Sequence, residues 1–150
     1  MVSRVLTVLV FGCCLAADSP SDVAKKEQEK LQGTWQVVKG EMGGEELPEE
    51  ALKDVSLVIK GDKMMAKGDF PDKDRYATVL FKINPAAKPK EIDLTLGGSE
   101  DKGTKLKGIY QLDGDQLKLC VNIAGANRPS KFDTKDDAEC ILVTLKRTKS

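Results

Sequence analysis

Histidine is absent from all 150 residues of the sequence, and this absence excludes more chemistry than any other feature of the composition. Without histidine the chain lacks the usual general base near neutral pH, the usual partner of a catalytic serine or cysteine, and the commonest zinc ligand. The sequence also contains no phosphate-binding glycine loop, nucleophile elbow or metal-ligand spacing. We therefore expect a protein that is not an enzyme and that holds no metal or cofactor.

The sequence also lacks an excess of charge of either sign. Lysine and arginine total 24, as do aspartate and glutamate, so the formal net charge is zero. Without a basic excess to attract phosphate groups, nucleic acid is not an expected partner. Aromatic residues are scarce at 5%, but 40% of the residues are hydrophobic, which is enough to build a core. A chain of this length has room for a single domain.

The sequence contains no long apolar run, and its N-terminal apolar stretch is short. Arg4, the run Val5 to Gly12, and the small residues Ala16 and Ala17 together form the pattern of a secretory signal peptide over residues 1–17. The run is too short to span a bilayer as a mature helix. We therefore expect an exported protein that is periplasmic, secreted or associated with the cell envelope.

The same segment also resembles a bacterial lipobox, through Val10-Phe11-Gly12-Cys13. In that alternative Cys13 carries a lipid and holds the protein at a membrane, which is the only membrane contact we expect. Phe11 replaces the small or β-branched residue that is usual there, and this favours simple cleavage. The predicted organisation is a signal peptide (1–17), a polar lead-in (18–30) and one β-barrel domain (31–150).

The pattern after the signal peptide predicts one short helix and then strands. Ser21 to Gln32 is charged, and Val23 and Leu31 share one helical face with Glu27 between them. Pro48 to Asp54 has the length of one or two helical turns. The eight strand candidates are Gly33–Met42, Val55–Lys60, Asp62–Lys67, Arg75–Asn84, Glu91–Leu96, Lys105–Leu112, Gln116–Ile123 and Glu139–Arg147.

Alternation within these strands indicates a sheet with one wet face. Ile92, Leu94 and Leu96 point one way, while the residues between them are polar. Short connections such as Asp113-Gly114-Asp115 suit hairpins, so consecutive strands are expected to be neighbours. Eight strands in such a meander must hide two edges, and closing into an up-and-down barrel does this.

The segment Gly33-Thr34-Trp35 resembles the Gly-x-Trp opening of the lipocalins. More of the chain, from Leu31 to Arg147, resembles a family of small exported lipocalin-like domains from planctomycete-type bacteria. The matching pieces are Leu31–Val38, Leu57–Gly61, Lys88–Leu94, Gly108–Tyr110, Leu112–Cys120 and Arg128-Pro129. The resemblance implies an all-β fold, an antiparallel eight-stranded lipocalin-like barrel with a short N-terminal helical segment, but no assigned activity.

The resemblance implies structural roles for two residues, Trp35 and Arg147. It implies that Trp35 closes one end of the barrel and that Arg147, at the end of the last strand, packs over the indole ring. Core packing is the favoured role of Trp35 over ligand contact. The chain has no counterpart of the central Thr-Asp-Tyr motif of typical lipocalins, so their ligand binding does not transfer directly.

Cys120 and Cys140 fall on the more polar faces of their strands. If the two strands pair with these residues opposite each other, Leu119 meets Ile141, and a disulfide fits the register. Export favours oxidation. A disulfide and two unpaired thiols both remain open on the sequence alone, and a catalytic thiol is not expected without histidine.

Clusters of charged residues have simpler interpretations than sites. The acidic groups Asp69, Asp72 and Asp74, and Asp113 and Asp115, lack the glycine and distal glutamate of a calcium loop, so solvated turns are expected. Lys88 and Lys90 are expected to protect a strand edge or solvate a turn rather than to bind phosphate. Glu45, Glu46, Glu49 and Glu50 lie in a polar segment and are expected to form a solvated acidic surface.

By elimination, these observations predict a binding module that holds a small, mostly apolar ligand in the interior or the mouth of the barrel. The alternative is a structural or protein-interaction domain of the cell envelope with a filled core. An eight-stranded barrel has room for either one small ligand or packed side chains. The sequence leaves the ligand, the partner proteins and the oligomeric state open.

Overall fold

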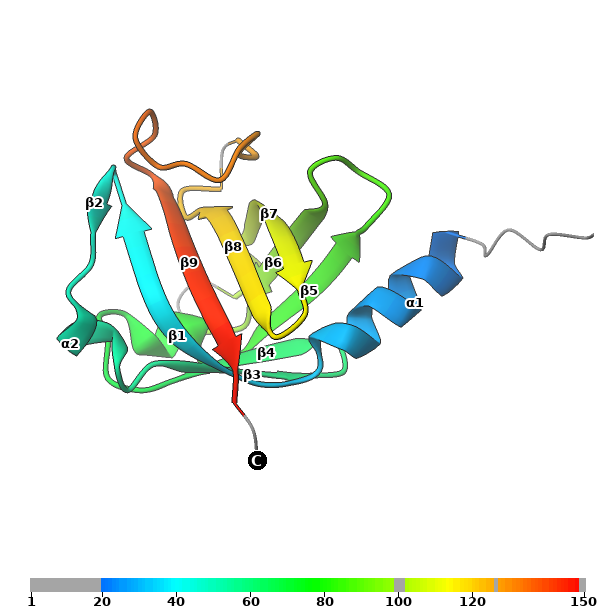
Figure 1. The fold of residues 1–150 in the computed structure, drawn as a ribbon, viewed down its shortest axis with the longest axis horizontal. Coiled ribbons are helices and arrows are strands. Elements are labelled where there is room, and N and C mark those ends of the chain that lie inside the picture. The colour runs from blue at the N-terminus through cyan, green and yellow to red at the C-terminus, as the bar shows by residue number, and fades with distance from the viewer. Residues whose placement is uncertain (1–19, 99–101, 126, 149–150) are drawn as a thin grey trace, which may run out of the picture.

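The computed structural model describes residues 20–98, 102–125 and 127–148, which form a mostly β fold (Figure 1). The helices of this part are α1 (Pro20–Leu31), α2 (Glu49–Leu52) and the short 3-10 helix η1 (Lys73–Tyr76). The strands are β1 (Gly33–Met42), β2 (Glu45–Glu46), β3 (Ser56–Lys60), β4 (Lys63–Lys67), β5 (Val79–Asn84), β6 (Glu91–Leu96), β7 (Lys105–Asp113), β8 (Gln116–Asn122) and β9 (Cys140–Arg147).

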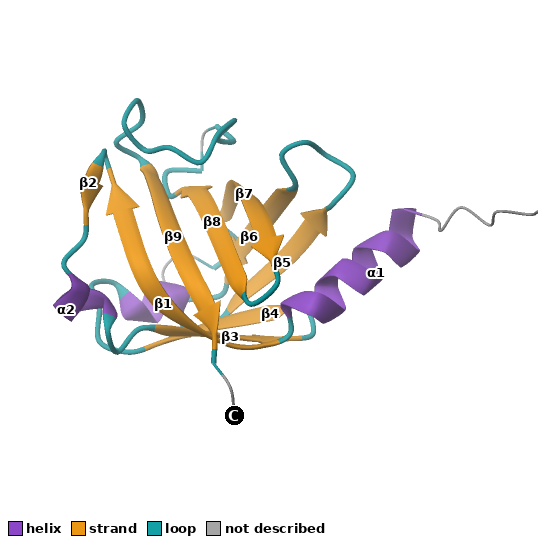
Figure 2. Cartoon of the chain, viewed as in Figure 1, coloured by secondary structure: helices purple, strands orange, loops and turns teal. Residues whose placement is uncertain are grey.

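The strands close into a barrel, which confirms the predicted fold class. Every neighbouring pair is antiparallel, in the order β2-β1-β3-β4-β5-β6-β7-β8-β9, and β1 also pairs with β9. Trp35 lies opposite Arg147 in that closing pair. The two-residue β2 pairs only with the end of β1, so eight strands form the wall (Figure 2). Closure removes the edges that an open meander would expose.

Alternation along the strands fills the interior with apolar side chains, because successive residues point to opposite faces of a strand. Trp35, Tyr110 and Phe81 are all at most 3% exposed. The buried residues of this core are Leu31, Trp35, Val37, Leu52, Ile59, Met64, Val79, Phe81, Ile92, Leu96, Leu106, Tyr110, Leu117, Leu119, Val121 and Leu145. The barrel therefore encloses packed side chains drawn from all eight wall strands.

Helix α1 forms where the sequence predicts a helix, one residue earlier at each end. It leaves the barrel at the end where β1 begins and β9 ends (Figure 1). Its inner face buries Leu31 and Glu27, while Val23, one turn further out, is 40% exposed. These two buried side chains of α1 therefore both lie in its second half.

The strand predicted from Arg75 to Asn84 is too long at its start. Residues Lys73–Tyr76 form η1 instead, and β5 begins at Val79. The helix follows Asp72, which adopts a left-handed conformation with a φ of 57°. This turn leaves β4 and β5 paired at only two positions, Lys63 with Leu80 and Met64 with Val79. Local turn geometry here outweighs the strand propensity of the segment.

The described part of the connection between β8 and β9, residues 123–125 and 127–139, folds over the outside of the barrel, and we call it the strap. Arg128 of the strap donates hydrogen bonds to the carbonyl oxygens of Gly108 (2.8 Å) and Ile92 (3.2 Å). At its other end Thr134, which is fully buried, donates to Glu41 Oε1 (2.8 Å) and accepts from the Gly44 N–H (2.9 Å). The strap thus ties β6 and β7 to β1 across the outer face.

No helix within the described ranges has the length and apolar character needed to cross a membrane. The predicted signal peptide and Cys13 lie in residues 1–19, outside the described residues.

Candidate functional site at the closed end of the barrel

Trp35 and Arg147 close one end of the barrel together. The Arg147 guanidinium carbon lies 4.3 Å from the centre of the Trp35 ring, and the indole N–H donates to the Leu31 carbonyl at 2.9 Å. Gly33 leaves room for this stack, since a Cβ there would lie 3.1 Å from Arg147 Nη1 and its φ is +123°. The structure therefore brings together the three residues that the lipocalin resemblance singled out.

Arg147 also fastens the C-terminal end of α1 to the barrel. Its Nη1 donates to the Gln32 carbonyl (2.6 Å) and its Nη2 to the Lys30 carbonyl (2.5 Å). The last carbonyl groups of a helix lack partners within the helix and carry partial negative charge, so a cation there is favourable. The remaining nitrogen, Nε, lies 3.3 Å from Asp115 Oδ1 in the β7–β8 turn.

Glu27 is a buried carboxylate on the inner face of α1, only 7% exposed. Lys90, just before β6, donates to Glu27 Oε1 at 2.5 Å, and the Tyr110 hydroxyl donates to the same oxygen at 3.4 Å. Lys30 Nζ lies 3.8 Å from Glu27 Oε2. A buried charge is tolerated when it is paired and hydrogen-bonded, and these contacts meet that condition.

Burial, reinforced by the negative charge of Glu27, raises the pKa of Tyr110 well above its ordinary value of 10.0. The tyrosine therefore stays protonated near neutral pH and acts as a hydrogen-bond donor to Glu27. The Lys90 ammonium also lies 5.9 Å from the centre of the Tyr110 ring. The Tyr110 hydroxyl and the Lys90 ammonium therefore both act as donors toward the Glu27 carboxylate.

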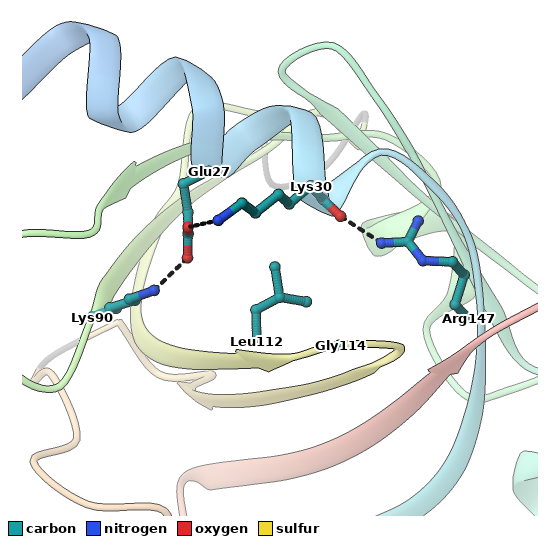
Figure 3. Close-up of a pocket in the computed structure, with 6 residues that line it drawn as sticks. All are labelled: Glu27, Lys30, Lys90, Leu112, Gly114 and Arg147. Atoms are coloured by element: carbon teal, nitrogen blue, oxygen red, sulfur yellow. Dashed lines mark hydrogen bonds and ion pairs between the residues drawn. The ribbon is translucent and has the colours of Figure 1, made fainter. Parts of the chain in front are cut away.

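A cavity of about 410 Å³ lies between α1 and this end of the barrel. Figure 3 shows Glu27 and Lys90 on one side of it and Arg147 on the other, with Lys30 and Leu112 between them. The lining residues are Glu27, Lys30, Lys90, Leu112, Gly114 and Arg147. They come from α1, the approach to β6, the β7–β8 hairpin and β9, so segments far apart in sequence form one concave site.

A second hollow, of about 250 Å³, lies on the outer face of the wall. It is lined by residues of β1, β8 and β9: Lys39, Glu41, Gln116, Lys118, Leu142 and Thr144. Lys39 here contacts Glu46 of β2 at 2.9 Å, and this pair raises the pKa of the Lys39 ammonium. Neither hollow is lined by the fully buried residues of the barrel core.

The predicted pairing of Cys120 with Cys140 is wrong in register. Cys120 lies opposite Leu142, and Cys140 lies opposite Asn122, a shift of two residues from the expected alignment. Both thiols are free and buried, in a small outer cluster with Ile109. They remain on the same face because a two-residue shift preserves the alternation.

Burial determines the pKa of these two free thiols. It raises the pKa of both, that of Cys140 to about 12, with a hydrogen bond to Asp137 as the next cause. Phe132 of the strap packs against the cluster from outside. Because the thiolate is the reactive form, the raised pKa lowers the reactivity of both thiols at neutral pH.

The acidic clusters are spread over exposed turns and the β1–α2 segment. Asp69, Asp72 and Asp74 are exposed around η1, and Asp113 and Asp115 are exposed in the β7–β8 turn. Glu45, Glu46, Glu49 and Glu50 are exposed as well. Throughout residues 20–98, 102–125 and 127–148, no three acidic or cysteine side chains are placed to hold a metal ion.

Lys90 differs from its expected role of protecting a strand edge or solvating a turn. It is partly buried, because the ion pair with Glu27 draws its ammonium toward the helix. Lys88, two residues earlier, is exposed. The sequence contained one signal of this pair: Glu27 lies between Val23 and Leu31 on the apolar face of the predicted helix.

Comparisons with known proteins add little to this geometry. No family model matches the chain, and no curated protein matches it. Among solved structures, the crystal structure of a mutant of the fluorescent protein UnaG is similar, with a TM-score of 0.38 and 14% sequence identity. The match covers 81% of this chain and 99% of that chain.

Proposed function

We propose that the protein is an exported, non-enzymatic, lipocalin-like domain that binds a small ligand in the cavity between α1 and the closed end of the barrel. The observation that carries the proposal is the convergence of six residues from separate segments around a volume of about 410 Å³. That volume falls within the range of small-molecule sites, roughly 300–1,000 Å³.

The site of the ligand differs from the one expected from sequence. An apolar molecule inside the barrel would have to displace Trp35, Tyr110 and their neighbours, which fill the interior. The cavity at the closed end is ready-made and concave, and four of its six lining residues are charged. A preformed site of this kind avoids the cost of reorganising a packed core.

The non-enzymatic part of the proposal rests on the state of the nucleophiles. The chain contains no histidine, and both buried thiols have raised pKa values. Tyr110, whose hydroxyl contacts Glu27, is also held in its protonated form. Export rests on the N-terminal pattern of Arg4, the apolar run and Ala16-Ala17.

The test is native mass spectrometry of the exported protein, combined with a variant that blocks the cavity. Leu112→Trp places an indole in the cavity without changing a charge, and Leu80→Trp, at a 42% exposed position on β5, is the matched control. A co-purifying small molecule should remain with the control and be lost from Leu112→Trp. Retention of the molecule by folded Leu112→Trp contradicts the proposed site.

The filled interior also favours a second candidate, a protein-interaction domain of the cell envelope. Such a domain would recognise its partner on the outer wall rather than in the cavity. In that case crosslinking in envelope fractions should give the same partner with wild type and Leu112→Trp, and no small molecule should accompany either protein.

A further inference from the structure

We infer that the ligand of the closed-end cavity is a compact organic oxyanion, a carboxylate or phosphate group attached to a small apolar body. This inference rests on the proposed function and names the chemical class that the site selects. Three features of the cavity support it: its charge, the environment of Glu27 and the position of Leu112.

The cavity carries more positive than negative charge. Lys30, Lys90 and Arg147 contribute three cations to its lining, against the single carboxylate of Glu27. Asp115, which contacts Arg147 from outside the lining, is 64% exposed and offsets part of the excess. The Arg147 hydrogen bonds to the Lys30 and Gln32 carbonyls satisfy its donors but leave its formal charge in place.

The contacts of Glu27 show that the cations around the cavity already bind a carboxylate. Its carboxylate receives an ammonium from Lys90, a second and longer contact from Lys30, and a hydroxyl donor from Tyr110. Each ammonium has three donors, so neither lysine is saturated by one carboxylate. Lys30 has the most freedom, because its side chain is 66% exposed and its contact is 3.8 Å long. A second oxyanion beside Glu27 therefore finds donors already in place.

Leu112 supplies the apolar part of the site. It is partly buried, packs against the barrel core, and lies between the Lys90 side and the Arg147 side of the cavity (Figure 3). A ligand whose anionic group contacts the lysines would therefore place its remaining atoms over this leucine. The volume of about 410 Å³ suits a compact body.

The experiment is an NMR titration of isotope-labelled, full-domain protein with matched aromatic probes. Benzoate and phenyl phosphate carry the anion, benzyl alcohol is the neutral counterpart, and benzylammonium is the cationic one. We expect benzoate and phenyl phosphate to shift the resonances of Lys30, Lys90 and Leu112, and benzylammonium to leave them unchanged. Lys30→Met should weaken benzoate about fivefold, the scale of one exposed ion pair. Lys118→Met, on the outer wall, is the matched control and should have no effect.

A second variant separates ligand binding from a purely structural role of the cluster. Glu27→Gln removes the competing carboxylate while keeping its shape, so benzoate should bind about fivefold more tightly. A merely structural Glu27 would leave the affinity unchanged or lower it. Unlike Lys90→Met, this variant leaves no buried carboxylate without its cation.

The outcomes distinguish the two proposals. Equal binding of benzyl alcohol and benzoate, with the same residues shifted, overturns the oxyanion inference but leaves the cavity as the binding site. Resonance shifts confined to residues outside the cavity overturn both the oxyanion inference and the proposed binding site. Both are also overturned if no soluble probe shifts any resonance and the protein does not bind vesicles. Co-sedimentation with phosphatidylglycerol vesicles but not phosphatidylcholine vesicles, lost in Lys30→Met, identifies a lipid head group as the source of the oxyanion. Binding of the soluble probes without vesicle binding identifies a free molecule.

Discussion

Replacing Arg147 with Met tests whether one side chain both stacks on Trp35 and anchors α1. Methionine keeps an apolar stem over the indole but removes the guanidinium. The change removes two hydrogen bonds to helix-end carbonyls, at 2.6 and 2.5 Å, and the cation–π contact at 4.3 Å. It also removes the contact with Asp115, which is mostly exposed and contributes little.

The expected loss follows from these contacts. Hydrogen bonds to a charged group contribute about 1.5–3 kcal/mol each when buried. Arg147 is 29% exposed, and water can reach the carbonyls that it leaves, so the lower part of that range applies. A cation–π contact adds about 1 kcal/mol. We therefore expect Arg147→Met to lower the free energy of unfolding by about 4 kcal/mol, against about 0.5 kcal/mol or less for the exposed neighbour Lys146→Met.

A double-mutant cycle with Trp35→Leu isolates the stack. Trp35→Leu alone should cost about 3 kcal/mol or more, because it empties part of a fully buried volume. The two losses should fall short of additivity by about 1 kcal/mol, since each removes the same contact. Urea unfolding followed by circular dichroism measures all four proteins. A coupling within about 0.3 kcal/mol of zero would refute the stacking argument.

Three further predictions concern the thiols, the strap and the N-terminus. Burial raises the pKa of Cys140 to about 12, so the folded protein keeps a proton that the unfolded chain releases above pH 9. The free energy of unfolding should therefore fall between pH 9 and 12, by up to about 1.4 kcal/mol per pH unit for that thiol. Cys140→Ala should flatten this fall in alkaline urea titrations, and both thiols should react with an alkylating agent only after unfolding. Thr134→Val should cost about 1–3 kcal/mol and speed amide exchange in the strap, because it removes two partly buried hydrogen bonds. N-terminal sequencing of exported protein should begin after Ala16 or Ala17, and an intact Met1 would contradict export by cleavage.

The barrel could be predicted because its signals are local. The alternation of Ile92, Leu94 and Leu96 determines which face of β6 points inward, whatever its neighbours are. The bounds of β1 and β6 agree with the prediction at both ends. Eight such strands with short connections have few ways to bury their edges, so closure follows from pattern and edge chemistry together.

Register was not predictable in the same way. Pairing Leu119 with Ile141, as expected, or with Val143, as observed, places the same side chains inside. Only a shift by an odd number of residues would move a core residue to the outer face. The sequence therefore determines the face of Cys120 and Cys140 but leaves open their alignment, on which a disulfide depends.

The strap was missed because its cluster interrupts the alternation. Ile109 and Leu142 are apolar residues at outward positions, and an isolated outward hydrophobic residue is ordinary on a protein surface. Together with Cys120 and Cys140 on adjacent strands, they form a patch that needs a cover. The strap residue Phe132 supplies it.

Glu27 shows how a buried site can be reached from sequence by an argument about charge. The residue lies four positions from Val23 and four from Leu31, so a helix that docks Leu31 into the barrel carries Glu27 toward it. A carboxylate cannot be buried alone without a large free-energy cost, so docking requires a cation at the closed end of the barrel. Lys90, 63 residues away and just before β6, lies at that end and supplies the cation by donating to Glu27 Oε1. The same reasoning predicts that Lys90→Met undocks α1, whereas Lys90→Met combined with Glu27→Leu restores docking, which amide exchange of α1 measures directly.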